Sequence, residues 1–179
     1  MLQDIERVFF TEDEIKARVQ ELGKQISDDY RGKTPLFVSV LKGSFVFMAD
    51  LMRSVGIYCD IDFMAVSSYG SKTVSSGAVE ITKDLSYDID GRDIIIIEDI
   101  LDSGITLAYL KKYMEMRNPA SIAICALLDK PARRKADIVP DYSGFLCPDS
   151  FIVGYGLDYN ERYRNLPFIG VLKPEIYEN

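Results

Sequence analysis

Hydrophobic residues are spaced along this chain in two distinct ways. Over residues 11–30 they recur three and four positions apart, which predicts an amphipathic helix, with Thr11 as its N-cap and Glu14 completing a capping box. Elsewhere they form short apolar or alternating runs, which are typical of strands. The strand-like runs lie at 35–41, 58–69, 78–85, 93–100, 120–130 and 150–159, and two further helices are expected over 45–56 and 105–117.

The order of these elements predicts the class of fold. Strands that alternate with helices and are largely apolar indicate an α/β protein with a mainly parallel sheet flanked by helices. The runs 58–69 and 78–85 are expected to pair across a polar tip. The chain has 179 residues and shows no repeat or linker, so we expect a single domain over 1–179. Ligands in such folds bind beyond the carboxyl ends of the strands.

Composition and charge narrow the range of functions. No stretch approaches the roughly 18 consecutive apolar residues that a membrane span needs. The start of the chain mixes acids into its apolar residues and lacks a signal-peptide pattern, so a cytoplasmic protein is expected. The formal net charge of -7 argues against binding to nucleic acid or to an anionic membrane.

The chain contains no histidine, so the usual neutral-pH base and the commonest metal ligand are both missing. Its three cysteines, Cys59, Cys125 and Cys147, are widely spaced and form no C-x-x-C pair. This spacing argues against a disulfide framework and against a zinc site. Acid–base chemistry must therefore use carboxylates, Lys, Tyr or Cys, and any metal is expected to be a hard ion such as Mg²⁺.

The segment IIIIEDILDSGITL places three acids directly after the most apolar strand. A Ser-Gly turn before a helix offers free backbone N–H groups to an anion, so the loop 102–106 is expected to hold a phosphate. Carboxylates repel phosphate, but they can accept hydrogen bonds from sugar hydroxyls or share a Mg²⁺ ion. The combination indicates a ribose phosphate; the alternative is that the acids only cap the helix. The acids are Glu98, Asp99 and Asp102.

Several separate segments together resemble one enzyme family. IIIIEDILDSGITL resembles the phosphoribosyl-pyrophosphate motif of the type I phosphoribosyltransferases. LKGS, SSYGS, LLDK and FIVGYGLDYNERYR are similar to segments of the hypoxanthine-guanine branch of that family, in the same order and nearly end to end. The resemblance implies a purine salvage enzyme in which N9 of hypoxanthine or guanine displaces pyrophosphate from 5-phosphoribosyl 1-pyrophosphate (PRPP), giving IMP or GMP.

The resemblance also implies roles for the acidic segment. Glu98 and Asp99 would face the ribose hydroxyls, directly or through Mg²⁺, and Asp102 would be the general base or acid at purine N7. Position 105 is Ile where many relatives carry a polar or basic residue, and its side chain is expected to point away from the phosphate. The expected PRPP-binding residues are Glu98, Asp99, Asp102, Ser103, Gly104, Ile105 and Thr106.

A second set of residues is implied to bind the pyrophosphate. The Lys42-Gly43 turn would receive it, with a cis peptide bond between Leu41 and Lys42, and Arg164 would reach it from a later loop. Ser68 and Tyr69 would close over it as part of a β-hairpin lid at about 67–83, which would exclude water. Without the resemblance, Lys42 is interpreted equally well as a lysine whose aliphatic stem covers apolar surface.

The purine would be bound by residues from the last third of the chain. Lys130 would donate to the oxygen at purine C6, which selects 6-oxopurines over adenine because an ammonium only donates. Phe151 would stack on the base, the backbone of Ile152, in place of the common Val, would meet its edge, and Asp158 would help hold a second Mg²⁺. The expected metal ligands are thus Glu98, Asp99 and Asp158. The neighbouring basic residues Arg133, Arg134 and Lys135 are interpreted as a solvated face or a subunit contact.

The resemblance further implies a hood formed by the N-terminal segment and about 130–179, and assembly into a homodimer or homotetramer. Three alternatives stay open. A phosphoacceptor receiver domain shares the fold class, but residues 1–40 lack the acid pair it needs. A nucleotide-sensing RNA-binding regulator on the same scaffold would bind ligand without turnover. A relative that prefers xanthine or guanine would differ mainly in backbone contacts, which side chains do not reveal.

Overall fold

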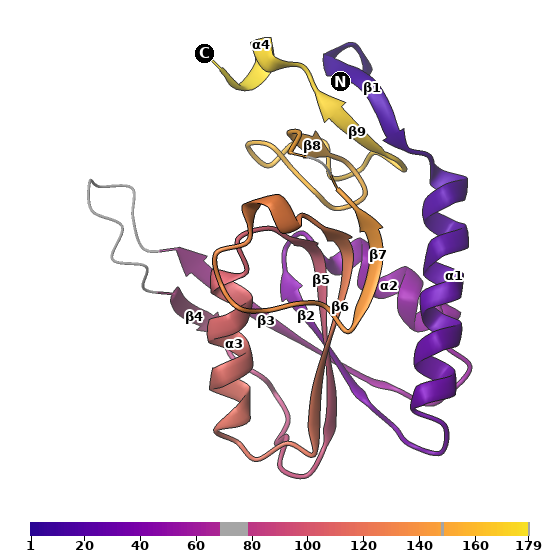
Figure 1. Ribbon diagram of the computed structural model, residues 1–179, viewed down its shortest axis with the longest axis vertical. Coiled ribbons are helices and arrows are strands. Elements are labelled where there is room, and N and C mark those ends of the chain that lie inside the picture. The colour runs from indigo at the N-terminus through magenta and orange to yellow at the C-terminus, as the bar shows by residue number, and fades with distance from the viewer. Residues whose placement is uncertain (69–78, 148, 179) are drawn as a thin grey trace.

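The computed structural model describes residues 1–68, 79–147 and 149–178. Its centre is a six-stranded sheet in the order β4-β3-β2-β5-β6-β7 (Figure 1). All neighbours pair in parallel except β4, which pairs antiparallel with β3 as the sequence predicted. The strands are Leu36–Leu41 (β2), Asp60–Ser68 (β3), Val79–Lys83 (β4), Asp93–Leu101 (β5), Ser121–Asp129 (β6) and Tyr142–Leu146 (β7).

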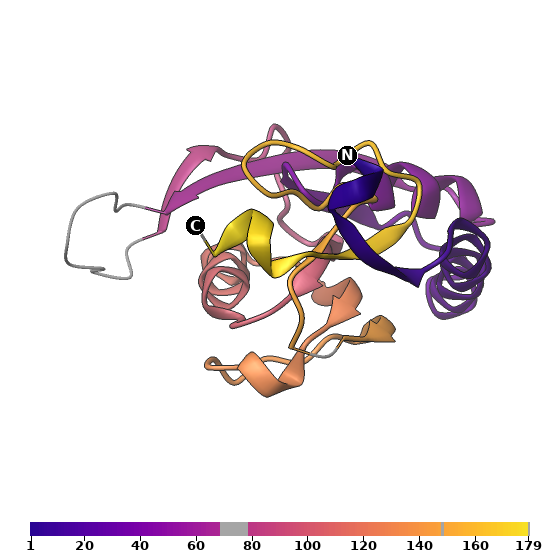
Figure 2. The same cartoon turned by 90° about the horizontal axis from the view of Figure 1, so that it is seen from above.

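Helices cover both faces of this sheet (Figures 1 and 2). Helices α1 (Glu12–Asp29) and α2 (Phe45–Ser54) pack on one face, and α3 (Ile105–Glu115) packs on the other. The four consecutive isoleucines of β5 alternate between these faces. Ile95 and Ile97 belong to the core with α1 and α2, whereas Ile94 and Ile96 belong to the core with α3. The isoleucine run is therefore apolar throughout because both of its sides are buried.

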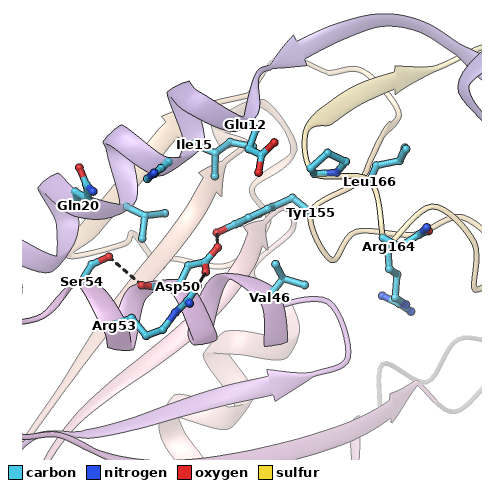
Figure 3. A pocket seen from close by; sticks show the side chains of 14 residues that line it. Glu12, Ile15, Gln20, Val46, Asp50, Arg53, Ser54, Tyr155, Arg164 and Leu166 are labelled. Carbon is cyan, nitrogen blue, oxygen red and sulfur yellow. Dashed lines mark hydrogen bonds and ion pairs between the residues drawn. The ribbon is translucent and has the colours of Figure 1, made fainter.

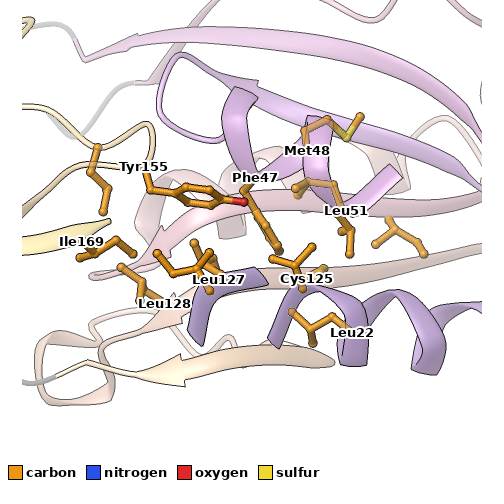
Figure 4. Packing of buried hydrophobic residues seen from close by; sticks show 14 of the residues in the cluster. Leu22, Phe47, Met48, Leu51, Cys125, Leu127, Leu128, Tyr155 and Ile169 are labelled. Atoms are coloured by element: carbon orange, nitrogen blue, oxygen red, sulfur yellow. The ribbon is translucent and has the colours of Figure 1, made fainter. Parts of the chain in front are cut away.

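The core on the α1–α2 face extends up to the loops that follow the strands. Phe47 and Leu51 of α2 belong to the same buried cluster as Cys125 and Leu127 of β6 (Figure 4). Tyr155, from a loop late in the chain, joins this cluster with its ring. Its hydroxyl donates a hydrogen bond to Asp50 Oδ2 at 2.6 Å. The late loop is thereby fixed to α2.

The start of α1 matches the sequence prediction. The Thr11 hydroxyl accepts a hydrogen bond from the Glu14 amide at 3.3 Å, and the Thr11 amide donates to Glu14 Oε2 at 2.8 Å. This reciprocal pair is the predicted capping box.

The two ends of the chain meet in a second, three-stranded antiparallel sheet. Its order is β1-β9-β8, so the strand nearest the N-terminus pairs with the last strand of the chain. The strands are Ile5–Phe10 (β1), Ile152–Val153 (β8) and Ile169–Leu172 (β9), and the short helical segments are η1 (Leu2–Asp4), η2 (Pro131–Arg133) and α4 (Pro174–Tyr177). The expectation that this region acts as a hood, within one functional domain, stays a prediction.

One predicted strand is wrong in length and in place. The run 150–159 contributes only β8, which belongs to the small sheet and not to the central one. The strand ends because Gly154, Tyr155 and Gly156 have positive φ angles of 103°, 50° and 101°. Such angles turn the chain out of an extended path. The strands β1, β7 and β9 were not expected at all.

Among residues 1–68, 79–147 and 149–178, no disulfide forms. Cys125 and Cys147 are buried and Cys59 is half-buried. A search of the same residues finds no helix with the length and hydrophobicity needed to cross a membrane.

Candidate active site

The predicted site residues gather at the carboxyl ends of β2, β5 and β6, where the chain passes from strand to loop. Gly43 follows β2 and lies against Asp99, near the end of β5. A Cβ atom added to Gly43 would be 1.7 Å from Asp99 Oδ2. On its other side, the Gly43 carbonyl oxygen would be 2.2 Å from a Cβ on Gly156. The turn after β2 therefore lies between Asp99 and Gly156. A side chain at position 43 would collide with Asp99, and one at position 156 would collide with the turn.

Two adjacent carboxyl groups, those of Glu98 and Asp99, lie half-buried at this point. Burial, and the nearby Asp99 charge, raise the pKa of Glu98 well above its usual value. Burial also raises the pKa of Asp99 to about 6, although the amide of Ile100 and the guanidinium of Arg164 oppose that shift. Two adjacent acids whose pKa values are raised, chiefly by burial, are typical of a site that binds a cation or hydroxyl donors.

A group of charged residues faces these acids from the loop 156–164. Arg164 donates to Asp158 Oδ1 at 2.8 Å and to the Gly156 carbonyl at 2.8 Å. The exposed Lys42, whose peptide bond with Leu41 is cis as the resemblance implied, pairs with Glu161 Oε1 at 3.0 Å. Lys42 and Arg164 thus lie at the same end of the central sheet as Asp99. Each is paired with an acid, Lys42 with Glu161 and Arg164 with Asp158.

The loop 102–106 connects β5 to α3. Gly104 is the N-cap of α3 and has a φ of 75°, which is why glycine is needed there. Ile105 is exposed, and the Ser103 hydroxyl accepts a hydrogen bond from the Ile105 amide at 3.4 Å. The first turn of α3 therefore presents backbone N–H groups at this end of the sheet, as an anion site requires.

The end of β6 brings a buried lysine close to the predicted acid or base. Only 4% of Lys130 is exposed, and its ammonium contacts Asp149 Oδ1 and the Ser150 carbonyl, both at 3.1 Å. Arg133 lies 3.4 Å from the same Asp149 oxygen and 3.6 Å from Asp102 Oδ2. Asp149 and Arg133 therefore connect the Lys130 ammonium to the Asp102 carboxylate through a series of neighbouring charged groups.

Phe151 lies next to Ser150 and is 38% exposed. Tyr177 of α4 stacks on its ring at a centroid distance of 4.5 Å, and Tyr159 meets it edge-on at 5.5 Å. Ile152 is buried in the small sheet, where it pairs with Val171. An aromatic surface thus lies beside the Lys130 ammonium.

Two predicted residues lie at or beyond the edge of the described residues. Ser68 ends β3, and nothing beyond its backbone is described. Tyr69 lies outside the described residues, as does most of the predicted lid. The other predicted site residues lie at the carboxyl end of the central sheet or on the loops that follow it, except Ile152, which lies in β8 of the small sheet.

The interpretation of the basic segment was wrong for one residue. Arg134 was expected to be solvated or to contact a subunit, yet only 14% of its side chain is exposed. It pairs with Asp129 and donates to the carbonyl groups of neighbouring loops. A sequence cannot show this, because carbonyl acceptors leave no trace in residue identity.

Two cavities border the site. One of about 500 Å³ is lined by Leu41, Lys42, Phe45, Phe63, Glu161 and Arg164, and lies beside the Lys42 turn. A larger cavity of about 640 Å³ lies between α1, α2 and the loop 155–167 (Figure 3). Tyr155 and Asp50 meet within it, and Arg164 borders both cavities.

Comparisons with known proteins decide the family. A model of the phosphoribosyl transferase domain matches residues 10–160. A hypoxanthine-guanine phosphoribosyltransferase of Bacillus subtilis is 56% identical over 179 residues, which cover 100% of this chain and 99% of that protein. The chain belongs to the hypoxanthine-guanine phosphoribosyltransferases. Another such enzyme, from Streptococcus thermophilus, is 51% identical over 98% of this chain and 97% of its own length.

Solved structures of this family share the fold. The crystal structure of a hypoxanthine phosphoribosyltransferase from Staphylococcus aureus has a TM-score of 0.96 and 50% sequence identity, covering 100% of this chain and 97% of that one. The fold expected from the sequence, a mainly parallel sheet flanked by helices in the type I phosphoribosyltransferase arrangement, is therefore confirmed.

The donor set of this phosphoribosyltransferase fits a divalent cation that is shared with its substrate. Within the described ranges, no three acidic or cysteine side chains converge in a way that could hold a metal by themselves. Mg²⁺ commonly uses only one or two carboxylates and takes its other ligands from phosphates and water. Glu98 Oε2 is buried without a hydrogen-bond partner, and Asp99 has a raised pKa, so both acids can accept a cation.

Sequence reasoning missed three residues of this site. Gly156 packs on the turn after β2, Glu161 pairs with Lys42, and Asp149 holds Lys130. The repeated glycines in GYG at 154–156 were the available signal, because paired glycines often mark close backbone contacts. Nothing in the sequence distinguishes Glu161 or Asp149 from other loop acids.

Proposed function

We propose that this site transfers the 5-phosphoribosyl group of PRPP to N9 of hypoxanthine or guanine, with Glu98, Asp102 and Arg164 among the residues that contact the substrates. One observation supports this most strongly. Among the described residues, three buried side-chain atoms lack a hydrogen-bond partner: Glu98 Oε2, Asp102 Oδ1 and Arg164 Nε. All three belong to the set that the sequence assigned to PRPP and its pyrophosphate. Buried polar atoms are rarely left unpaired, so these three support a polar ligand.

PRPP is proposed to bind with its two charged ends in different places. Its 5′-phosphate is accepted by backbone N–H groups of the loop 102–106 at the start of α3. Its pyrophosphate is accepted by Lys42 and Arg164, with Gly43 allowing close approach. Lys42 must then exchange its contact with Glu161 for one with the ligand, which its 66% exposed side chain permits. Ser68 and Tyr69 are proposed to complete this end as part of the lid.

Glu98 and Asp99 are proposed to lie beneath the ribose, between the two charged ends. When bound there with PRPP, Mg²⁺ would neutralise the pyrophosphate and orient it as a leaving group. Asp158 is the proposed third acid near this metal region. Its oxygens accept hydrogen bonds from Arg164 and from the Glu161 amide, and each carboxylate oxygen retains further acceptor capacity.

The purine is proposed to bind over Phe151, with Lys130 donating to its C6 oxygen and the backbone of Ile152 at its edge. An ammonium cannot accept a hydrogen bond, so the amino group at C6 of adenine would place a donor against the Lys130 ammonium in place of an acceptor. That ammonium is buried, which makes the mismatch costly. A 6-oxopurine is therefore favoured.

Asp102 is proposed to exchange a proton with purine N7. The glycosidic bond forms at N9 as the pyrophosphate leaves C1′, and the ring must lose a proton during this step. The chain contains no histidine, and the Asp102 carboxylate is the proposed acceptor of that proton. The unpaired Asp102 Oδ1 supplies the acceptor.

The enzyme is proposed to act in the cytoplasm as a homodimer or homotetramer. Phe45 on α2 is 45% exposed beside the cavity at the Lys42 turn, and Tyr58 is 87% exposed. Exposed aromatic residues of this kind are enriched at protein interfaces. Light scattering on the purified protein measures the oligomeric state directly.

Product formation tests the proposed reaction. The purified protein is given PRPP, Mg²⁺ and one of hypoxanthine, guanine, xanthine or adenine, and nucleotide and pyrophosphate are measured together. We expect equal amounts of both products with hypoxanthine or guanine and none with adenine. Absence of product from every base would contradict the proposal.

A further inference from the structure

The residues 130–138, here called the brace, follow β6 and lie behind the turn that begins the loop 102–106. Their backbone amides donate to the carbonyl groups of that turn. The Lys130 amide bonds to the Leu101 carbonyl at 3.0 Å, and the amides of Lys135 and Ala136 bond to the Ser103 carbonyl at 2.9 and 3.1 Å. The brace therefore holds the turn from its far side.

Arg134 is the centre of the brace. Its Nε donates to the Asp102 carbonyl at 3.0 Å, and one terminal nitrogen donates to the Leu101 carbonyl at 3.1 Å. Its guanidinium also contacts the Ile138 carbonyl and the Asp129 carboxylate. One planar fork thus ties β5, β6 and the brace together.

These contacts fix the direction of the peptide groups in the turn. In a trans peptide the C=O of one residue and the N–H of the next point in opposite directions. The carbonyls of Leu101, Asp102 and Ser103 all point toward the brace. The following N–H groups, up to Gly104, must therefore point away from it. Successive N–H groups on one side of a turn form an anion-binding concavity.

The turn has no room to relax toward the brace. A Cβ atom on Gly104 would be 2.6 Å from Ile138 Cγ2 and 3.1 Å from Arg134 Cδ. The two segments are therefore in direct contact, and a change in the Arg134 side chain must be felt by the Gly104 backbone.

We propose that Arg134 is a positioning residue for the 5′-phosphate: it holds the carbonyls of residues 101 and 102 away from the ligand so that the amides of the turn face it. This inference rests on the proposed function of the loop 102–106 and deepens it. Arg134 does not touch the phosphate itself. It acts from the opposite side of the turn, through the backbone.

Comparing a nucleotide with its nucleoside tests the proposal. GMP and guanosine differ only in the 5′-phosphate, so the ratio of their dissociation constants measures how well the turn binds that group. The variant Arg134→Lys keeps the charge but loses the planar fork, and Lys135→Gln removes a neighbouring charge that lies in solvent. In Arg134→Lys we expect GMP affinity to fall about tenfold or more, with guanosine affinity unchanged within about twofold. In Lys135→Gln we expect neither to change.

The same data separate the possible failures. An equal loss of GMP and guanosine affinity in Arg134→Lys, or no loss of either, would overturn the positioning role. If the parent protein itself binds GMP no better than guanosine, the proposed phosphate loop is wrong instead.

Thermal unfolding shows whether Arg134→Lys is folded at the assay temperature. If it is not, Asp129→Asn, which removes the carboxylate partner of Arg134, must show the same selective loss of GMP affinity, and an unchanged ratio there would overturn the inference.

Discussion

Gly43 and Asp99 are in such close contact that a methyl group on Gly43 would lie 1.7 Å from Asp99 Oδ2. The variant Gly43→Ala must therefore displace either the turn after β2 or the Asp99 carboxylate. Misplacement of binding groups by about 1 Å can cost about 100-fold in rate. We expect kcat/KM for PRPP to fall by about that factor, measured by nucleotide formation under steady-state conditions.

The matched control is Gly56→Ala, at the other end of α2. The nearest atom to its added methyl group is Ser27 Oγ, at 4.0 Å, so little has to move. We expect its kcat/KM to stay within about twofold of the parent. Equal activity of the two variants would show that the contact between Gly43 and Asp99 has no role in substrate binding.

Base selectivity tests the role of Lys130. In Lys130→Gln, the charged donor to the C6 oxygen is replaced by a neutral amide. A hydrogen bond to a charged group contributes about 1.5–3 kcal/mol, so kcat/KM for hypoxanthine should fall about 10- to 100-fold. The KM for PRPP should change far less, because PRPP does not touch this side chain. A variant that loses PRPP affinity as strongly as hypoxanthine affinity would contradict the assignment.

The buried carboxylate of Asp62 makes stability depend on pH. Burial alone would raise the pKa of Asp62, but hydrogen bonds from the amides of Phe63 and Ser86 and the Lys83 ammonium lower it below its usual value. A lowered folded-state pKa gives stability that is complete above the unfolded-state pKa of about 3.9. That stability is lost as the pH falls through the folded-state value.

Urea unfolding of Asp62→Asn measures this contribution. Asp62 Oδ2 accepts from the amides of Ser86 and Tyr87, and Oδ1 accepts from the Phe63 amide and the Lys83 ammonium. Asparagine has only one accepting oxygen, so its NH₂ group must face donors at the other position, and we expect the free energy of unfolding at pH 7 to fall by about 1–3 kcal/mol. The difference from the parent should shrink below about pH 4, as the parent carboxylate is protonated. Glu115→Gln, at an exposed position of α3, should match the parent at every pH. A difference for Asp62→Asn that grows toward low pH would refute the account.

Removal of divalent metal tests the proposed cofactor. We expect chelation by EDTA to stop nucleotide formation and added Mg²⁺ to restore it. Asp99→Asn removes one of the two half-buried carboxylates, so about tenfold more Mg²⁺ should be needed for half-maximal activity. Full activity in EDTA would exclude the metal, and an unchanged Mg²⁺ requirement in the variant would exclude Asp99 as its ligand.

The sequence predicted correctly two elements whose pattern depends on residues close together in the chain. The helix of residues 12–29 and its capping box follow from spacing alone, because helix periodicity and capping are local. The strand of residues 93–101 was equally clear, because four isoleucines are buried on both sides. The acidic loop after it could be interpreted because its residue types are chemically unusual together.

Three features of the structure were not predicted. The 150–159 strand was misjudged because consecutive positive φ angles at Gly154, Tyr155 and Gly156 turn an apolar run into a loop. The role of Arg134 was missed because its partners are mostly carbonyl groups on other segments. The pairing of the chain ends in one small sheet depends on how the whole chain folds, and short strands leave a weak pattern.

The rate of the chemical step in Asp102→Asn tests the central claim, that a carboxylate does the proton transfer in a chain without histidine. With saturating PRPP and hypoxanthine, a single turnover is followed in the parent, in Asp102→Asn and in the control Glu115→Gln. We expect Asp102→Asn to be about 100- to 10,000-fold slower, with PRPP affinity within a few-fold of the parent, because general acid–base catalysis has that magnitude. A single-turnover rate equal to that of the parent and the control would contradict the claim.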